Sequence, residues 1–264
     1  MLKFDQRKLD KLNSVDESDI YILTDFDNTV TKDSKFSSWT SVFLNPKTSE
    51  EFINVCKGIY KKYHEYEIDT SLSYEEKRKI MDEWYKVNVQ TVVDFKVTRE
   101  IIESAASSMK QAQMRSGAKK FFKTMYEKGI PVLIISAGVG NVIELFLREM
   151  GCLYDNVHIY SNFFEYKDDV VIGVKDNAVV HPLNKQDVIT DPIVWNEIKK
   201  RHNAILIGNS VNDIKMILND KHNVFKIGFI TGDEDMKECI EKYDIVCSND
   251  ESYTGLETLI DLFK

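Results

Sequence analysis

The sequence predicts an α/β fold: a doubly wound parallel-sheet core with an inserted helical cap and a small β-hairpin. A block between about residues 33 and 113 has helical periodicity and few apolar strands, which indicates an insertion. Two apolar triplets flank Asp176-Asn177 within residues 169–182, a pattern typical of a β-hairpin at the edge of a sheet. Short apolar segments, most followed by a polar turn and a helical pattern, predict parallel strands at 20–25, 132–136, 157–161, 204–208, 224–228 and 245–247.

The length of 264 residues suits one α/β core with a modest insertion. We predict a core formed by residues 1–34 and 115–264 and a helical cap formed by residues 35–114. The cap contains helical runs at about 49–65, 74–88 and 98–114, and Ser73 with Glu76 resembles a capping box. An insertion at this point would overhang the carboxyl ends of the strands and could act as a lid.

Composition excludes several classes of function. The net charge of −8 argues against binding of a nucleic acid polymer. No apolar stretch reaches the roughly 20 residues that span a bilayer, and the charged start does not resemble a secretory signal. We therefore expect a cytoplasmic monomer with a small-molecule substrate and no membrane partner. Reduced thiols are expected for the cysteines, which show no C-x-x-C spacing: Cys56, Cys152, Cys239 and Cys247.

Two carboxylates lie at the end of the first predicted strand. Asp25 and Asp27 stand two residues apart in ILTDFDNTVT, so both can point the same way while Phe26 packs on the other face. Two like charges held this close are unfavourable unless a cation or a shared proton relieves them. The pair therefore indicates either Mg²⁺ binding, or a nucleophile beside a proton carrier. The alternative is an acidic turn without a function.

Three other segments carry polar groups suited to a phosphate. Ser136, Ala137 and Gly138 end the second strand, where a hydroxyl and backbone N–H groups suit an anion at a helix N-terminus. Such turns are also common without a ligand. Lys185 follows the predicted hairpin and could neutralise phosphoryl oxygens, although most lysines are solvated surface residues.

Asn209 and Asp213 follow the fourth strand, one helical turn apart, so both can face the same spot. Oxygen ligands at a strand end suit Mg²⁺. Helix capping by Asn209 or Ser210 is an alternative that does not exclude metal binding.

In this order, the segments resemble the four motifs of the haloacid dehalogenase superfamily of phosphohydrolases. The stretches SNFFEYKDD, HPLNKQD, GNSVNDIKMI and KIGFITGDEDMKECIEKYDIVCSNDES narrow the resemblance to the pyrimidine 5'-nucleotidases, also called cytosolic 5'-nucleotidase type III. KKYHEYEID and SYEEKRKIMDEWY in the insertion agree with this. The resemblance covers nearly the whole chain from Ile20 onward and weakens only between Lys32 and about Glu50.

The resemblance implies Mg²⁺-dependent hydrolysis of nucleoside 5'-monophosphates, with CMP and UMP as expected substrates. Asp25 would form an aspartyl-phosphate, while Asp27 would protonate the leaving nucleoside and then activate water. Lys185 would balance the charge on the nucleophile and the phosphate. Contacts to the phosphoryl group would come from Thr29, Ser136, Ala137 and Gly138. Mg²⁺ would be bound by the Asp25 carboxylate, the Asp27 carbonyl and residue 209, with Asp213 as a further candidate.

The cap would recognise the nucleoside. By resemblance, Glu67 contacts the base and Asn88 replaces a cap serine near the phosphate. Trp84 and Tyr85 are candidates for flanking a flat ring, with packing of the cap as the alternative for both. Relatives that prefer 7-methylguanosine monophosphate would carry a larger indole at position 85, so Tyr85 favours pyrimidines.

One residue departs from the family motif Gly-Asp-Ser-x-x-Asp, because this chain has Asn209 in place of the first aspartate. An amide oxygen can still coordinate a metal, but it brings no charge. A tolerated variant, an inactivating substitution and a degenerate homologue all remain open. The competing hypotheses are therefore a 7-methylguanosine monophosphate nucleotidase, a transferase of the phosphoryl group to another nucleoside, a phosphatase of small phosphometabolites such as phosphoserine, and a weakly active or silent nucleotide-binding protein.

Overall fold

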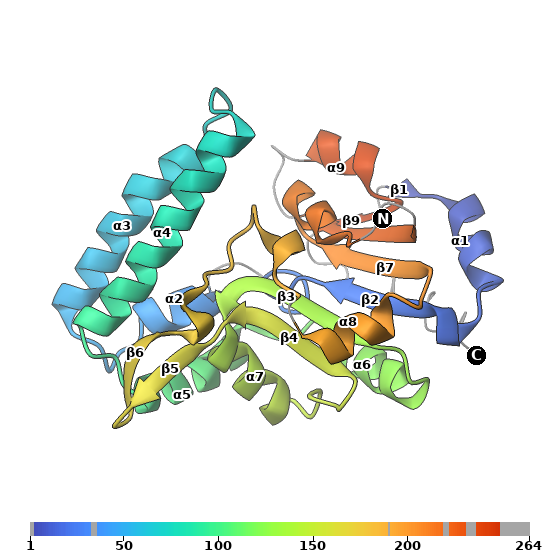
Figure 1. The fold of residues 1–264 in the computed structure, drawn as a ribbon. Coiled ribbons are helices and arrows are strands. Elements are labelled where there is room, and N and C mark those ends of the chain that lie inside the picture. The colour runs from blue at the N-terminus through green and yellow to red at the C-terminus, as the bar shows by residue number, and fades with distance from the viewer. Residues whose placement is uncertain (1–2, 33–35, 190, 219–221, 231–235, 249–264) are drawn as a thin grey trace.

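The computed structural model describes residues 3–32, 36–189, 191–218, 222–230 and 236–248. Within them, seven strands form one sheet in the order β1-β9-β8-β7-β2-β3-β4 (Figure 1). β1 (Lys3–Phe4) pairs antiparallel with β9, and all other neighbours are parallel. The six predicted parallel strands are confirmed as β2 (Ile20–Thr24), β3 (Val132–Val139), β4 (Val157–Asn162), β7 (Asn203–Gly208), β8 (Asn223–Ile230) and β9 (Ile245–Ser248).

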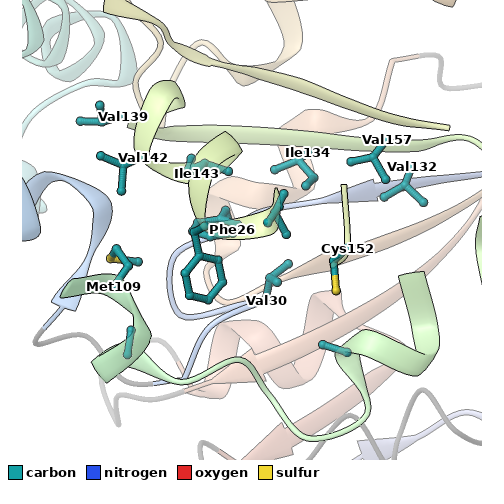
Figure 2. Packing of buried hydrophobic residues seen from close by; sticks show 14 of the residues in the cluster. Phe26, Val30, Met109, Val132, Ile134, Val139, Val142, Ile143, Cys152 and Val157 are labelled. Carbon is teal, nitrogen blue, oxygen red and sulfur yellow. The ribbon is translucent and has the colours of Figure 1, made fainter. Parts of the chain in front are cut away.

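The sheet is buried on both faces, as the alternation along β2 illustrates. Ile20 and Ile22 belong to one apolar cluster, and Tyr21 and Leu23 belong to the other. Part of the first cluster, around Phe26, is drawn in Figure 2. The first cluster includes residues of α1 (Gln6–Asn13), α6 (Ala118–Glu127) and α7 (Gly140–Glu149), and the second those of α8 (Pro192–Ile198) and α9 (Met236–Lys242). The doubly wound core is therefore confirmed.

The insertion is helical, as predicted. It contains α2 (Ser38–Phe43), α3 (Glu50–Ile68), α4 (Tyr74–Asp94) and α5 (Arg99–Ser108), and a 3₁₀ turn (Met109–Ala112) follows. Ser73 and Glu76 form the predicted capping box at the start of α4. α3 and α4 pack on each other and stand away from the sheet, whereas α5 packs against α7 of the core (Figure 1). The domain boundaries at residues 34 and 114 remain a prediction.

The hairpin prediction was wrong in its second half. Val170–Val174 is a strand, β6, but its partner is β5 (Phe164–Lys167), and residues 178–180 form no strand. The two-residue turn is Asp168-Asp169, with φ of 50° and 62°. Asp176-Asn177 also takes positive φ, in a 3₁₀ turn beyond the hairpin. Asp and Asn both tolerate this conformation, so turn chemistry alone could not choose between the two pairs. The hairpin is also a separate two-stranded sheet and not an extension of the main one.

No helix in the described part of the chain is long and apolar enough to cross a membrane. The four cysteines are buried and form no disulfide. Burial raises the pKa of the Cys56 thiol to about 12, so this side chain is an unreactive apolar group of the core.

Candidate active site

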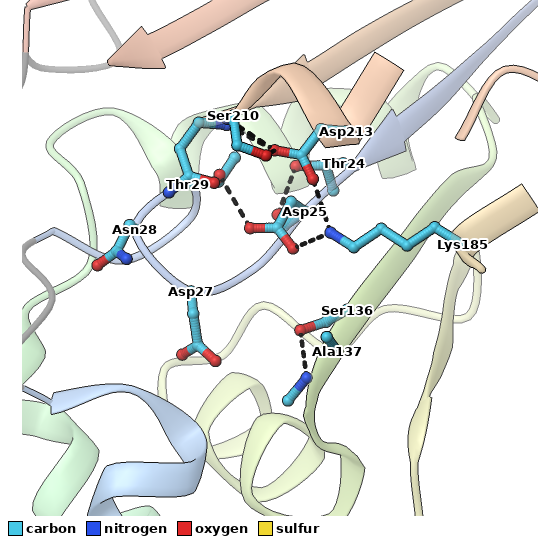
Figure 3. A network of polar contacts seen from close by, with 12 residues as sticks. Thr24, Asp25, Asp27, Asn28, Thr29, Ser136, Ala137, Lys185, Ser210 and Asp213 are labelled. Carbon is cyan, nitrogen blue, oxygen red and sulfur yellow. Dashed lines mark hydrogen bonds and ion pairs between the residues drawn. The ribbon is translucent and has the colours of Figure 1, made fainter. Parts of the chain in front are cut away.

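The predicted site residues converge because of the strand order. β2 lies between β3 and β7, and the carboxyl ends of neighbouring parallel strands meet at one edge of the sheet. Asp25 follows β2 directly, Ser136 lies in β3, and Asn209 follows β7. Lys185 comes from a short 3₁₀ turn (Lys185–Asp187) and extends towards Asp25 (Figure 3).

Lys185 bridges two buried carboxylates. Its Nζ lies 2.6 Å from Asp25 Oδ1 and 2.7 Å from Asp213 Oδ1. The three side chains are only 4%, 8% and 3% exposed, respectively. Thr29 Oγ1 donates to the other oxygen of Asp25 at 3.1 Å. Both oxygens of Asp25 are thus oriented by partners, which holds the proposed nucleophile in one rotamer.

Asp213 organises the turn after β7. Its Oδ2 accepts hydrogen bonds from the backbone N–H groups of Asn209 and Ser210, both at 2.9 Å, and from Ser210 Oγ at 3.2 Å. Gly208 permits this approach, because a Cβ there would lie 2.5 Å from Asp213 Cβ. Of the two capping residues considered from the sequence, Ser210 is the N-cap of the following 3₁₀ turn (Val211–Met216). Asp213 also helps to position Lys185.

The charges at this edge do not balance. Burial raises the pKa of Asp25 to about 7, with Lys185 opposing the shift and Asp213 adding to it. Burial also disfavours charge on Lys185, but Asp213 and Asp25 outweigh it and raise the pKa of the ammonium above its ordinary value. One ammonium thus faces two carboxylates, so a further cation would be favoured here.

The oxygen chemistry of these groups fits a hard divalent cation. In the described chain, no three His, Cys, Asp or Glu side chains form a group able to hold a metal ion. A metal at this edge would therefore need carbonyl or amide oxygens beside the Asp25 carboxylate. The predicted set of Asp25, the Asp27 carbonyl and Asn209 has this composition, and Asn209 lies directly beside the Asp213 carboxylate through its backbone N–H.

Asp27 is held by a residue that the sequence did not indicate. Ser38, at the start of α2, donates its N–H to Asp27 Oδ1 at 2.9 Å and its hydroxyl to Oδ2 at 2.6 Å. Burial raises the pKa of Asp27, and the two Ser38 hydrogen bonds oppose that shift. The pair Ser37-Ser38 signals a helix start, and Ser37 is indeed the N-cap of α2. Nothing in the sequence connects Ser38 with Asp27.

The turn at the end of β3 packs tightly against Asp27 and Ser38. Gly138 N–H donates to Ser136 Oγ, and Val139 N–H donates to Ser38 Oγ, both at 3.0 Å. A Cβ at Gly138 would lie 2.2 Å from Ser38 Oγ and 2.9 Å from Asp27 Oδ2. Glycine is therefore required here, because only a residue without a Cβ lets the backbone come this close to Ser38 and Asp27.

The loop before Lys185 is built by its own side chains. Asn184 Oδ1 accepts from the backbone N–H of His181 at 2.8 Å, and His181 Nδ1 accepts from Leu183 N–H at 3.2 Å. Burial lowers the pKa of His181 to about 4, so its imidazole is neutral near pH 7 and can accept this bond. The HPLN sequence thus forms a fixed turn that directs Lys185 inward.

Arg115 is a second residue that sequence reasoning missed. Its guanidinium is buried and donates to the carbonyls of Thr29 and Asn28, at 2.8 and 2.7 Å. It also lies 4.4 Å from the centre of the Phe229 ring. These contacts support the loop after Asp25, in which Asn28 adopts a φ of 62°. No local pattern distinguishes this arginine from surface ones.

The residues predicted to recognise the nucleoside lie on α3 and α4. The Tyr85 ring lies 6.0 Å from His181 and 6.1 Å from Trp39. Burial raises the pKa of Tyr85, and the charges of Glu67, Asp27 and Asp25 add to this shift. Tyr85 therefore lies close enough to feel both the Glu67 carboxylate of the cap and the two aspartates of the core. Glu67 is half-exposed and pairs with His64 of the cap at 3.0 Å.

Asn88 and Trp84 lie within the cap as well. Asn88 is buried one helical turn after Tyr85 on α4. Trp84 stacks on Tyr63, with ring centres 5.9 Å apart, and belongs to a small cluster with Leu183. Trp84 therefore has the packing role that was the alternative to stacking on a base.

Comparison with known proteins gives the family. Residues 23–264 match the model of the pyrimidine 5'-nucleotidase (UMPH-1) family. The chain is 27% identical over 257 residues to the 7-methylguanosine phosphate-specific 5'-nucleotidase A of Xenopus laevis, covering 94% of this chain and 88% of that protein. It is 28% identical over 256 residues to the 7-methylguanosine phosphate-specific 5'-nucleotidase of Homo sapiens, covering 91% and 83%.

Its fold is similar to that of cytosolic 5'-nucleotidase IIIB in complex with cytidine. The TM-score is 0.87 at 28% identity, covering 97% of this chain and 89% of the other. The structure of a probable phosphoserine phosphatase from Vibrio cholerae shares the fold alone, with a TM-score of 0.60 at 13% identity, covering 95% of this chain and 67% of the other. The chain belongs to the pyrimidine 5'-nucleotidase (UMPH-1) family and is a hydrolase of the 5'-nucleotidase class with a haloacid dehalogenase-like fold.

Proposed function

We propose that this protein hydrolyses pyrimidine nucleoside 5'-monophosphates in a Mg²⁺-dependent reaction that passes through an aspartyl-phosphate on Asp25. The observation that carries the proposal is the buried Asp25 carboxylate, oriented by Lys185 at 2.6 Å and Thr29 at 3.1 Å. A carboxylate fixed in this way at a strand end suits in-line attack on phosphorus.

In the first step, an Asp25 oxygen forms a bond to phosphorus while the bond to the nucleoside 5'-oxygen breaks. Asp27 gives its proton to that oxygen, and its raised pKa favours the protonated form that this step requires. In the second step, Asp27 takes a proton from water, and the water oxygen attacks the aspartyl-phosphate. Free phosphate leaves, and Asp25 and the Asp27 proton are regenerated.

The other residues stabilise charge in both steps. The Lys185 ammonium, the Ser136 hydroxyl and the backbone N–H groups near Ala137 and Gly138 would contact the phosphoryl oxygens. We assign Mg²⁺ to the Asp25 carboxylate, the Asp27 carbonyl and Asn209. The metal would supply positive charge against the phosphoryl group. Asp213 would position these ligands, because its carboxylate oxygens accept hydrogen bonds from Lys185 and from the backbone of Asn209 and Ser210.

For the base, we assign recognition to Glu67 and stacking to Tyr85, with Asn88 near the phosphate. A carboxylate accepts hydrogen bonds, so it favours a base edge that presents N–H donors, such as the amino group of cytosine. The same argument applies to 7-methylguanine, and the named specificity of the Xenopus and human relatives supports that alternative. Silent nucleotide binding is supported only by Asn209.

A substrate panel separates these possibilities. We expect phosphate release from CMP and UMP with millimolar Mg²⁺, at a higher kcat/KM than from 7-methylguanosine monophosphate or phosphoserine. Glu67→Ala should reduce kcat/KM for nucleotides and leave phosphoserine unaffected. A clear preference for 7-methylguanosine monophosphate would replace the pyrimidine assignment. A higher kcat/KM for phosphoserine than for nucleotides, unchanged in Glu67→Ala, would exclude nucleotides as the substrate class as well.

Asn209→Asp should strengthen metal binding. The substitution adds one negative charge where we place Mg²⁺, and even changes outside the first ligand shell alter metal affinity by roughly 10- to 100-fold. The Mg²⁺ concentration for half-maximal activity should therefore fall by at least about 10-fold. Titration of activity with MgCl₂ measures this, with Asn212→Asp as the matched control in the same turn. An unchanged half-maximal concentration would show that residue 209 is not a ligand.

Ser38→Ala should impair proton transfer by Asp27. The variant loses the hydroxyl at 2.6 Å but keeps the N–H at 2.9 Å, so Asp27 is held less firmly. We expect kcat/KM for CMP to fall about 10- to 100-fold. The loss should be smaller for 4-nitrophenyl phosphate, because its leaving group needs no proton. Ser38→Thr, which keeps the hydroxyl, should restore activity. Equal losses for both substrates would contradict this role.

We also propose that the protein is a cytoplasmic monomer whose partner is a nucleoside monophosphate, with neither a nucleic acid polymer nor a membrane as a partner. The four buried cysteine thiols, the net charge of −8 and the similarity to a cytosolic 5'-nucleotidase support these assignments. Light scattering of the purified protein at several concentrations tests the monomer, and a mass of twice 30.6 kDa would contradict it.

A further inference from the structure

The carbonyl groups of the turn at the end of β3 are bound by side chains from three different segments. Trp39 Nε1 donates to the Ala137 carbonyl at 2.8 Å. Asn162 Nδ2 donates to the same oxygen at 2.9 Å and to the Gly138 carbonyl at 3.0 Å. Ser161 Oγ also donates to the Gly138 carbonyl, at 2.8 Å. Each of the two carbonyls thus has two donors.

These bonds determine where the N–H groups of the turn point. In a trans peptide the C=O and the following N–H point in opposite directions, and the described chain has no cis peptide. With the Ala137 carbonyl held on the Asn162 side, Gly138 N–H is directed to the opposite side, where Ser136 Oγ accepts it. Val139 N–H is directed in the same way to Ser38 Oγ, which also contacts Asp27.

Asn162 is the member of this group with the most contacts. It is the last residue of β4 and is fully buried. Its Oδ1 accepts from Val180 N–H at 2.8 Å, and its Nδ2 also lies 2.9 Å from the Val180 carbonyl, so its two N–H groups are shared among three carbonyl oxygens. Asn162 therefore ties the end of β3 to the segment that leads into the Lys185 loop. Its polar atoms all serve backbone groups, so an apolar residue would leave buried carbonyls with fewer donors.

We propose that Asn162 is a positioning residue that makes the Ser136–Val139 turn bind anions. It holds two carbonyl oxygens away from the site, so that the Gly138 N–H points to Ser136 Oγ and the proton of the Ser136 hydroxyl is left to donate to an anion. Without Asn162, each carbonyl keeps only one side-chain donor, Trp39 or Ser161, so either peptide rotates more readily and can present a carbonyl oxygen, which repels a phosphoryl oxygen. The identity of the anion as a nucleotide phosphoryl group rests on the function proposed above. The role of Asn162 in anion binding does not depend on it.

Orthovanadate is the probe, because it resembles the phosphoryl group in transfer and binds without turnover. Calorimetry with saturating Mg²⁺ compares the wild type with Asn162→Ala and with Asn156→Ala. Asn156 is a matched control, because its Nδ2 also donates to a buried backbone carbonyl, that of Ile130, at 2.7 Å just before β3 begins. We expect Asn162→Ala to bind orthovanadate at least about 10-fold more weakly. Asn156→Ala should stay within about twofold of the wild type, as expected for a site away from the anion.

Kinetics give a second readout that a merely structural role would not produce. Because the proposed role of the turn is to bind the phosphoryl group, which all three substrates share, kcat/KM should fall by a similar factor for CMP, UMP and 4-nitrophenyl phosphate. If Asn162→Ala does not fold, Trp39→Phe and Ser161→Ala each remove one donor and should weaken orthovanadate binding by a smaller factor in the same direction. Thermal melting of each variant establishes that it is folded.

Three results would overturn the inference. They are wild-type affinity for orthovanadate in Asn162→Ala, an equal loss in Asn156→Ala, and no orthovanadate binding by the wild type. A wild type that binds orthovanadate but hydrolyses no nucleotide would instead contradict the proposed function. In that case, weaker orthovanadate binding by Asn162→Ala would still support the positioning role.

Discussion

Asp25→Asn is expected to abolish turnover while nucleotide binding remains detectable. An amide does not attack phosphorus, and loss of a catalytic nucleophile costs about 10⁴-fold or more in kcat. Binding should survive because Lys185 keeps its second partner, Asp213, at 2.7 Å. Phosphate release from CMP measures the first effect, and calorimetric titration with CMP measures the second.

The stability of this variant provides its control. Burial raises the pKa of the Asp25 carboxyl to about 7, so the charged carboxylate is disfavoured in the folded protein. A neutral amide avoids that cost, and Lys185 keeps Asp213 as its partner, so we expect the melting temperature to stay close to that of the wild type. Turnover near the wild-type rate in Asp25→Asn would exclude the covalent mechanism. A large fall in melting temperature would mean that lost activity reflects unfolding.

Lys185→Met is expected to reduce both activity and stability. The change leaves Asp25 and Asp213 buried without their shared cation, and breaking a buried ion pair from one side costs roughly 3–5 kcal/mol in the free energy of unfolding. Loss of a charged group at the phosphoryl oxygens should lower kcat by about 10³-fold. Urea denaturation and phosphate release from CMP measure the two effects separately.

A double variant separates the two roles of Lys185. Lys185→Met with Asp213→Asn removes one of the two uncompensated carboxylates, so part of the lost stability should return. Activity should not return, because the cation near the phosphoryl group is still missing. Lys215→Met is the control, since Lys215 contacts the Tyr74 ring at 4.1 Å, a surface contact of a half-buried lysine. Recovered activity in the double variant would contradict the assigned role of Lys185.

The sheet and the motif residues were predictable from sequence because their signals are local. Each buried parallel strand is an apolar run, and each proposed site residue of the core stands at or near the end of such a run or in the HPLNK turn. The hairpin was predicted only in part, because Asp168-Asp169 and Asp176-Asn177 are equally suited to a turn with positive φ. The choice between them depends on pairing of β5 with β6, which the sequence pattern does not encode strongly.

The supporting residues were not predictable, because their roles arise from contacts between distant segments. Ser38 contacts a residue 11 positions away, Asn162 one 25 positions away, and Arg115 one 86 positions away. Serine, asparagine and arginine are ordinary residues at such positions, and nothing local marks them. Conversely, Lys185 looked like a surface lysine by itself, and only its burial between Asp25 and Asp213 gives it a distinct environment.

The most direct test of the proposed reaction is the rate of phosphate release from CMP by this chain, measured with millimolar Mg²⁺ and again with excess EDTA. Asp25→Asn, prepared in the same way, provides the background rate. If Asp25 and Mg²⁺ act as proposed, release depends on Mg²⁺ and exceeds this background by about 10⁴-fold. Release that is equal in EDTA, or equal in Asp25→Asn, would contradict it.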